Sequence, residues 1–367
     1  MKILITGNLG YVGPWVMRRL RAQCPEATLV GVDMGYFAHC LTDASVLPES
    51  RVDMQYFADV RRLPRRALED VTAIVHLAAI SNDPMGKAYE DATLDVNYRA
   101  SVALAQQAKA AGVRSFVFAS SCSVYGFAEG GARTESADVN PLTAYARSKV
   151  LTETALGELA DERFRTTCLR FATACGMSDR LRLDLVLNDF VASAIATRRI
   201  TVLSDGTPWR PLIDVQDMAR AIEWAVYREL DAGGHHLIVN TGSNEWNYQV
   251  RELADAVAAA IPGTEVSINH DAPPDKRSYR VDFSLFRRLA PTHVPELTLV
   301  DTVRGLRAGL EAMKFDNPDF RESQFIRLKV LTGLRSRRLL NDALEWLPQG
   351  AELSQAIQVE AGRTGVA

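Results

Sequence analysis

The sequence predicts an α/β fold, a doubly wound parallel sheet with a smaller α/β domain. Two observations carry this prediction. In the first half of the chain, short apolar runs alternate with amphipathic segments, as buried parallel strands alternate with the helices that cover them. After residue 176 this alternation breaks, and Pro, Arg and Asp become more frequent. The break predicts a second, smaller unit with its own short strands.

The first half supplies the elements of the large sheet. Its predicted strands are the apolar runs 3–6, 28–32, 53–57, 73–77, 115–119 and 166–171. Helical periodicity fills the gaps and is clearest over residues 96–111 and 145–162. Pro14 stands in the first turn of the first predicted helix, where a missing N–H costs nothing. Such repeated units favour a doubly wound sheet with right-handed crossovers.

The second half is less regular. Short strands are predicted at 200–203 and 266–268, and an Arg- and Leu-rich stretch at 325–346 predicts one or two appended helices. Its basic residues favour a solvated helix face over an RNA or membrane contact. The expected division is 1–176 with a return at about 214–240 for the large domain, 177–213 and 241–315 for the small one, 316–347 for the appended helices and 348–367 for a flexible tail.

Composition excludes several function classes. A formal net charge of -3 over 367 residues gives no basic field for nucleic acid. No apolar run approaches the roughly 20 residues that cross a bilayer, and no secretory signal is visible. Five cysteines without a Cys-x-x-Cys pair, and histidines without ligand spacing, are typical of reduced cytoplasmic thiols rather than of disulfides or a metal site. We therefore expect a cytoplasmic protein without a metal.

A glycine-rich turn follows the first predicted strand and opens the first helix. It consists of Gly7, Asn8, Leu9, Gly10, Tyr11, Val12 and Gly13. Glycines at this spacing let the backbone turn tightly and bring helix N–H groups against a pyrophosphate. The position in the first strand–helix turn predicts a dinucleotide-binding (Rossmann) domain.

Asp33 ends the second predicted strand, at the distance where an acid binds the adenosine ribose hydroxyls. Residues 34–39 contain no Arg or Lys that would neutralise a 2′-phosphate, so NAD is favoured over NADP. Asp59 and Val60, after the third strand, are candidates for the adenine edge. The small residues at the end of the fourth strand would let a cofactor lie against the backbone; this stretch is Leu77, Ala78 and Ala79.

Ser121, Tyr145 and Lys149 predict an enzyme. Ser121 follows the fifth strand, and Tyr145 and Lys149 share one face of the next helix because they are four residues apart. An ammonium beside a phenol, together with a positive nicotinamide ring, would lower the pKa of Tyr145. This phenol would take a proton from a hydroxyl while hydride leaves the same carbon, and Ser121 would orient the reacting oxygen.

Together these motifs resemble the extended short-chain dehydrogenase/reductase family, in particular its NAD-dependent sugar-nucleotide epimerases and dehydratases such as UDP-galactose 4-epimerase. The matching motifs are 6–13, 33, 76–79, 97, 120–126, 145–149 and 209–217. The resemblance implies a tightly held NAD, with Asn97, Tyr145 and Lys149 among its contacts. It also implies a nucleoside-diphosphate sugar whose diphosphate meets Arg210, and homodimers through a four-helix bundle of the helices near 96–111 and 145–162.

Departures from the family pattern favour one reaction. Dehydratases of this family carry Asp-Glu after the catalytic hydroxyl residue, whereas this chain has Cys122 and Ser123. Relatives that epimerise C3 and C5 place a cysteine base where Ser123 stands. The remaining reaction, 4-epimerisation, needs no additional base. A dehydratase with an unusual base, a net oxidoreductase and a non-catalytic NAD-binding scaffold are the alternatives.

The substrate side is less defined. Candidates for contacts to the sugar or the diphosphate are Ser81, Asn82, Ser121, Cys122, Ser123, Thr173, Asn188, Arg210, Arg277 and Arg280. Thr173 takes the place of the Asn that is usual in galactose-type epimerases. Arg277 and Arg280 are alternative second clamps for the diphosphate. The sequence leaves the sugar and the nucleotide base open.

Overall fold

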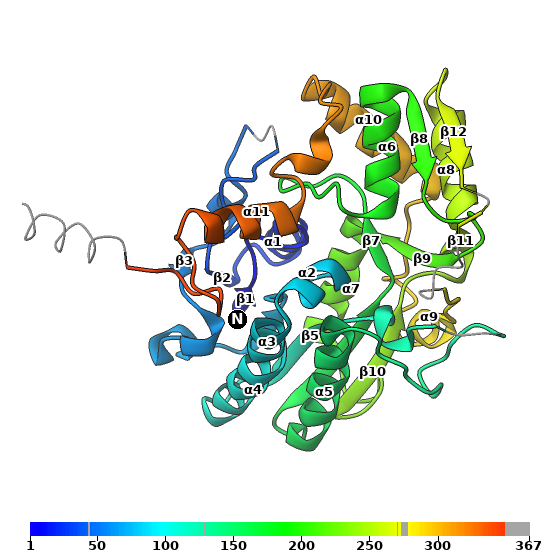
Figure 1. The fold of residues 1–367 in the computed structure, drawn as a ribbon. Helices are drawn as coiled ribbons and strands as arrows, with labels where there is room; N and C mark the ends of the chain where they lie inside the picture. Colours follow the sequence, from blue (N-terminus) through cyan, green and yellow to red (C-terminus); the bar gives the residue numbers. More distant parts are fainter. Residues whose placement is uncertain (43–44, 128–129, 270, 273–277, 349–367) are drawn as a thin grey trace, which may run out of the picture.

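The computed structural model describes residues 1–42, 45–127, 130–269, 271–272 and 278–348. Its centre is a seven-stranded, all-parallel sheet in the order β10-β6-β5-β4-β1-β2-β3, with helices on both faces (Figure 1). The predicted α/β fold class is therefore confirmed. The strand order reverses direction between β1 and β4, and in open parallel sheets ligands bind at the carboxyl edge near such a reversal.

The first six strands of this sheet agree with the predicted runs to within about two residues, and the seventh, β10, falls at the end of the stretch of about 214–240 that was expected to return to it. They are β1 (Lys2–Thr6), β2 (Thr28–Asp33), β3 (Met54–Phe57), β4 (Ala73–His76), β5 (Ser115–Ser121), β6 (Arg165–Phe171) and β10 (His236–Thr241). Burial on both faces explains the apolar runs of β1, β2 and β4, whereas the edge strand β3 is partly exposed. β5 is longer than predicted and carries Ser121 at its end.

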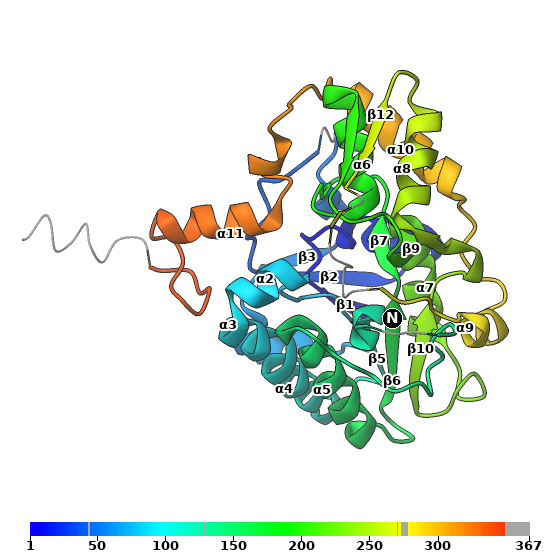
Figure 2. The same ribbon diagram turned by 45° about the vertical axis from the view of Figure 1, so that its right-hand side comes forward.

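Two helical layers cover the sheet. α1 (Gly13–Gln23) and α7 (Val215–Tyr227) pack together on one face. The other face carries α4 (Ala100–Ala110) and α5 (Ala144–Leu159), with the short helices α2 (Asp83–Ala88) and α3 (Glu90–Leu94) above them (Figure 2). The predicted helix 96–111 begins as a π-helical turn, Asp95–Arg99. At α5, the hydroxyl of Thr143 accepts a hydrogen bond from the Ala146 N–H and so fixes the first turn, which holds Tyr145.

The second part of the chain forms two small sheets. β7 (Thr173–Cys175), β9 (Trp209–Asp214) and β11 (Asn247–Gln249) make one, and β8 (Arg199–Val202) pairs with β12 (Glu265–Ile268) in the other. Around them lie the helices α6 (Val186–Thr197), α8 (Val250–Ala260), α9 (Ser284–Leu289) and α10 (Leu299–Ala312). Only β8 and β12 were predicted. The strands of the three-stranded sheet are short, and β9 contains Arg210 and Pro211, which hide its strand pattern.

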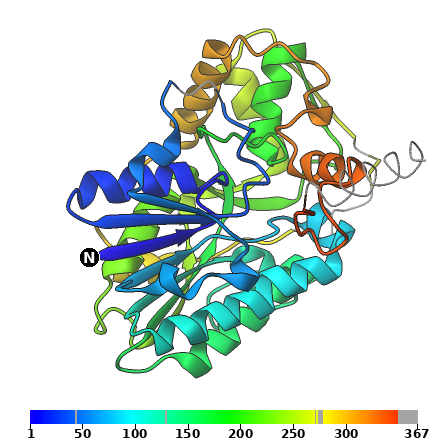
Figure 3. The same cartoon turned by 90° about the vertical axis from the view of Figure 1, so that its left-hand side faces the viewer.

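The last described segment folds back toward the large sheet (Figure 3). It contains one helix, α11 (Arg327–Ser336), followed by a turn that a bridge between Leu340 and Trp346 closes. The alternative of two appended helices is wrong, because Arg338 and Leu344 adopt positive φ angles that break a helix. The predicted tail lies almost wholly outside the described residues. No helix in the described ranges is long and apolar enough to cross a membrane.

Candidate active site

A cavity of about 980 Å³ opens at the carboxyl edge of the parallel sheet, between it and the second part of the chain. Its size is at the upper end of ligand pockets, as a dinucleotide and a second ligand would require. It brings together most predicted site residues. Those that line it are Gly7, Gly10, Tyr11, Val12, Asp33, Val60, Leu77, Ala78, Ala79, Ser81, Asn82, Ser121, Ser123, Tyr145, Lys149, Thr173 and Arg210.

The glycine turn after β1 is shaped by close backbone approach. Gly7 has a φ of +73°, and a Cβ there would lie 2.6 Å from the Ala78 nitrogen at the end of β4. At Gly13 a Cβ would lie 2.1 Å from the Asn8 carbonyl oxygen. Only glycine fits at either position, so the first turn of α1 reaches the cavity without obstruction. Its free N–H groups and positive helix end fit a pyrophosphate.

Asp33 lies where the second strand meets the cavity. Its carboxylate accepts hydrogen bonds from the N–H groups of Leu9 (3.1 Å) and Gly35 (2.7 Å). Burial raises the pKa of Asp33, and these two hydrogen bonds and Arg180 oppose that rise. A carboxylate held by backbone donors at the end of β2 fits adenosine ribose hydroxyls.

Five predicted cofactor residues do not line the cavity but support its wall. Leu9 offers its N–H to Asp33, and Gly13 packs on the glycine turn. The amide of Asn8 donates to Gln55 Oε1 at 2.7 Å, and the carboxylate of Asp59 forms an ion pair with Arg61 at 2.7 Å. The Asn97 amide accepts from the Ile80 N–H and donates to the Ile80 carbonyl. These polar groups are used inside the protein, so their proposed direct contact with the cofactor is not supported.

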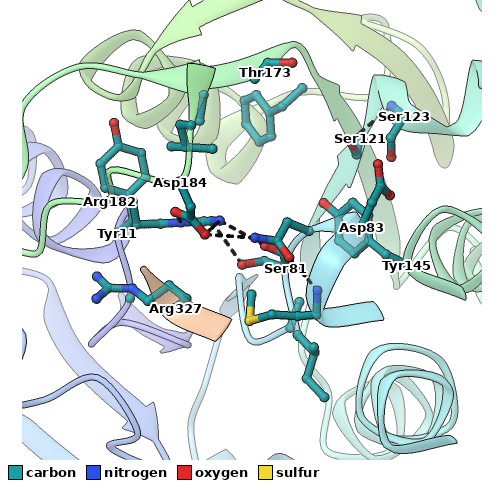
Figure 4. A pocket seen from close by; sticks show the side chains of 18 of the residues that line it. Tyr11, Ser81, Asp83, Ser121, Ser123, Tyr145, Thr173, Arg182, Asp184 and Arg327 are labelled. Atoms are coloured by element: carbon teal, nitrogen blue, oxygen red, sulfur yellow. Dashed lines mark hydrogen bonds and ion pairs between the residues drawn. The ribbon is translucent and has the colours of Figure 1, made fainter. Parts of the chain in front are cut away.

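Ser121, Tyr145 and Lys149 line the cavity together, as predicted from their spacing. Ser121 ends β5, and Tyr145 and Lys149 lie in the first two turns of α5. The side chains of Ser121 and Tyr145 face each other from these two elements (Figure 4). The Lys149 ammonium donates to the Ala119 carbonyl at 2.7 Å and lies 5.4 Å from the centre of the Tyr145 ring.

The acidic phenol expected beside a positive nicotinamide ring stays a prediction, and the protein groups alone hold the pKa of Tyr145 high. Burial raises the pKa of Tyr145 to about 12, and the hydrogen bond with Ser121 is the main opposing influence. Burial also lowers the pKa of Lys149 to about 8, while Glu153 opposes that change. The ammonium of Lys149 is directed at a backbone carbonyl, so Ser121 stabilises the phenolate more directly than Lys149 does.

A buried ion pair anchors the end of β5 that carries Ser121. Glu153 on α5 pairs with Arg170 on β6 at 2.7 Å, and a second guanidinium bond spans 2.9 Å. The neighbouring Ser120 hydroxyl donates to the same carboxylate at 2.5 Å. Arg170 also donates to the Tyr125 hydroxyl at 3.0 Å. This network ties β5, β6 and α5 together next to Ser121 in the chain.

Several predicted substrate residues lie elsewhere. Cys122 is buried, and its thiol donates to the Arg170 carbonyl at 3.1 Å, so it does not reach the cavity. Asn188 is buried too. Its amide accepts a hydrogen bond from the Gly176 N–H and donates one to the Arg182 carbonyl, so it is used by the backbone. Arg280 is exposed and lies over the Trp209 ring. Arg277 lies outside the described residues.

The cavity also contains polar residues that the sequence did not predict. Arg182 and Asp184 form an ion pair at 2.9 Å beside Ser81 and Asn82. Asp83 opens α2 and lies beside Tyr145 (Figure 4). Tyr279 and Arg327 reach the cavity from distant parts of the chain. No local motif marks these residues, although Tyr279 stands in the same Arg-rich run as the predicted clamps.

Comparisons with known proteins agree with this geometry. Residues 3–242 match the model of the NAD-dependent epimerase/dehydratase family. The UDP-glucose 4-epimerase of Streptomyces lividans is 29% identical over 269 residues, which cover 70% of this chain and 80% of that protein.

Solved structures with the same fold include enzymes that are named for different reactions. The UDP-glucose 4-epimerase of Stenotrophomonas maltophila, with bound NAD and formylated UDP-arabinopyranose, superposes with a TM-score of 0.74 at 25% identity and covers 86% of this chain and 99% of its own. The NAD-dependent NDP-hexosamine 5,6-dehydratase TunA gives a TM-score of 0.72 at 23% identity, covering 87% and 99%. The second likeness concerns the fold alone.

Proposed function

Because this chain belongs to the NAD-dependent epimerase/dehydratase family and NAD is its cofactor, we propose that it is a nucleoside-diphosphate-sugar 4-epimerase. UDP-sugars are the first candidates for the substrate, since the relatives in Streptomyces lividans and Stenotrophomonas maltophila are UDP-glucose 4-epimerases. The observation that carries the proposal is the convergence of Ser121, Tyr145 and Lys149 on a cavity that also holds the glycine turn and Asp33.

The residues divide into those that hold ligands and those that move a proton. The glycine turn and Asp33 would hold the dinucleotide, and Arg210 the substrate diphosphate. The chemistry that NAD supplies when bound is reversible hydride acceptance. The phenolate of Tyr145 accepts the proton of the sugar C4 hydroxyl as the C4–H bond breaks, and the Ser121 hydroxyl holds the reacting oxygen.

The return step inverts the carbon. Once the 4-keto sugar has turned its other face toward the cofactor, bound NAD would supply the returning hydride, and Tyr145 would give its proton back to the C4 oxygen. Atoms and electrons therefore balance without a net oxidant. The cavity of about 980 Å³ offers space for this rotation. Lys149 places positive charge near the phenol, 5.4 Å from its ring centre.

The neighbours of Ser121 favour epimerisation over dehydration. Cys122 is buried with its thiol on a backbone carbonyl, and burial raises its pKa far above the usual range. Ser123 lines the cavity but is neither an acid nor a base at neutral pH. The two positions after Ser121 therefore offer no group that would remove a C5 proton.

A dehydratase is the second candidate because of Asp83. Its carboxylate lies beside Tyr145 in the cavity, accepts a hydrogen bond from Thr143 at 2.7 Å, and contributes to the raised pKa of Tyr145 after burial. A carboxylate in this place would be the base for proton removal next to a C4 ketone. The fold likeness to a dehydratase is compatible with it.

Isotope exchange distinguishes the two reactions. Purified enzyme with NAD is incubated with UDP-glucose, UDP-galactose, their N-acetylhexosamine and uronic acid counterparts and the corresponding dTDP- and GDP-sugars in D2O. A 4-epimerase inverts C4 without taking up solvent deuterium, whereas deuterium at C5 with loss of water would establish dehydration. Tyr145→Phe should lose at least about 1000-fold in turnover while still binding NAD. Retained turnover in that variant would refute the role given to Tyr145.

Assembly and location are part of the same proposal. We infer a homodimer through α4 and α5, which pack side by side and present an exposed Leu151. Light scattering after gel filtration tests this, and Leu151→Glu should give monomers. We also infer a cytoplasmic location, supported by five cysteines without a disulfide. Detection in the periplasmic or secreted fraction would contradict it.

A further inference from the structure

Residues 327–347, here called the C-terminal cap, pack beside the loop that follows β2. The Trp346 indole N–H donates to the Met34 carbonyl at 2.7 Å, and the Tyr36 hydroxyl donates to the Leu344 carbonyl. Arg61 donates to the Ala343 carbonyl at 2.8 Å. Met34 and Tyr36 follow Asp33 on the loop after β2, so the cap lies against the adenosine end of the proposed dinucleotide site.

The cap also forms part of the cavity wall. Arg327 and Leu331, one turn apart on α11, line the cavity together with the glycine turn. Leu331 is buried in the same core as residues of β4 and β5. The family model matches only residues 3–242, so this contribution comes from a part of the chain beyond the match.

Arg327 is a buried cation that forms no ion pair with the described residues. Its side chain is 2% exposed, and its guanidinium donates to the carbonyls of Arg180 (2.9 Å), Leu181 (3.3 Å) and Gln324 (3.2 Å). It lies 4.7 Å from the centre of the Phe37 ring. Burial lowers the pKa of Arg327 to about 10, and nearby Arg182 and Arg180 contribute.

The other arginines around this end of the cavity have acidic partners. Arg180 pairs with Glu49 at 2.5 Å, Arg182 with Asp184 at 2.9 Å and Arg61 with Asp59 at 2.7 Å. Arg327 takes part in none of the ion pairs found among the described residues. A buried charge without an ion-pair partner is costly even with the attraction of Asp184 nearby, so this cation gains from an anion that enters the cavity.

We propose that Arg327 binds the pyrophosphate of NAD and that the C-terminal cap thereby forms part of the cofactor site and retains the dinucleotide. The pyrophosphate is the anionic part of NAD, and the glycine turn that fits it lines the same cavity as Arg327. A guanidinium carries five N–H donors, so Arg327 can offer a phosphate oxygen a charge-assisted hydrogen bond while it still donates to the three carbonyls. The proposal rests on the cofactor alone and is independent of which sugar reaction follows.

The test is calorimetric binding of NAD, ADP-ribose and adenosine to the full chain freed of cofactor. Arg327→Gln should weaken NAD and ADP-ribose roughly 10- to 100-fold, as expected for losing a hydrogen-bonded charge. Adenosine lacks the pyrophosphate, so its affinity should stay within about 3-fold of the wild type. Lys329→Gln removes an equal charge from the exposed side of α11 and is the matched control.

The outcomes separate a ligand role from a structural one. Unchanged ADP-ribose binding in Arg327→Gln overturns the proposal, and so does an equal loss for adenosine and ADP-ribose. If Arg327→Gln does not fold, Arg327→Met, which keeps an apolar stem on Phe37, serves as the neutral variant; failure of both to fold overturns the proposal by assigning the cation to the fold. None of these results depends on turnover, so the proposal fails or stands separately from 4-epimerisation.

Discussion

Removing the Ser121 hydroxyl tests how the protein activates Tyr145. The phenol of Tyr145 is buried, and burial raises its pKa to about 12, against which the hydrogen bond with Ser121 acts most strongly. A hydrogen bond to a charged group contributes about 1.5–3 kcal/mol. At about 1.4 kcal/mol per pKa unit, Ser121→Ala should raise the pKa of Tyr145 by about one to two units.

The sign of the effect follows from the role of the base. Only the phenolate accepts the substrate proton, and with a pKa of about 12 its fraction rises about tenfold per pH unit across the neutral range. The kcat/KM of the wild type should therefore increase with pH. On a logarithmic scale, the kcat/KM of Ser121→Ala should increase with pH in parallel with that of the wild type. It should be about 10- to 100-fold lower, because the phenolate is rarer at every pH.

The assay is the pH dependence of kcat/KM, from about pH 6 to 10, with the nucleotide sugar that turns over. Ser121→Thr keeps the hydroxyl and should stay within about threefold of the wild type, and NAD affinity should be unchanged in both variants. Three results would refute the reasoning: a flat wild-type profile, a Ser121→Ala rate within threefold of the wild type, or a Thr variant as slow as the Ala variant.

Three further predictions concern the residues around this pair. Burial is the main cause of the raised pKa of Tyr145, and Asp83 is a smaller one. Asp83→Asn should therefore lower that pKa and displace the pH profile of kcat/KM toward lower pH. A displacement toward higher pH would contradict this. Glu153→Gln breaks a buried ion pair with Arg170 and should lower the free energy of unfolding, measured in urea, by about 3–5 kcal/mol. A decrease below about 1 kcal/mol would show that the fold does not need the pair. In a thiol titration of the native protein, Cys24 alone should react quickly, since the other cysteines are buried, and a second fast thiol would argue against the described burial.

Local sequence patterns were sufficient where function depends on neighbours in the chain. The glycine turn is one such case, because Gly7 and Gly13 are required by contacts within a short strand–turn–helix unit and its adjacent strand. The Tyr145–Lys149 spacing is another, since helical geometry alone places both on one face. The large sheet was predictable for the same reason: its buried strands are continuous apolar runs.

The roles of polar side chains were harder to predict, because their hydrogen-bond partners depend on the tertiary structure. Asn188 has an amide that could bind a ligand, yet this amide forms hydrogen bonds with the backbone of residues 176 and 182. Cys122 directly follows Ser121 in sequence, but its thiol donates to the Arg170 carbonyl on the adjacent strand. Neither orientation is encoded in the order of residues nearby.

The sequence by itself was sufficient to predict the fold class, NAD as the cofactor and the residues that we propose for the proton transfer. The tertiary structure decided the electrostatics of that site and its far wall. The pKa of Tyr145 depends on how much protein surrounds the phenol, and burial outweighs the hydrogen bond with Ser121. Arg327 reaches the cavity of the glycine turn from more than 300 residues away along the chain, and such a contact follows only from the packing of the whole molecule.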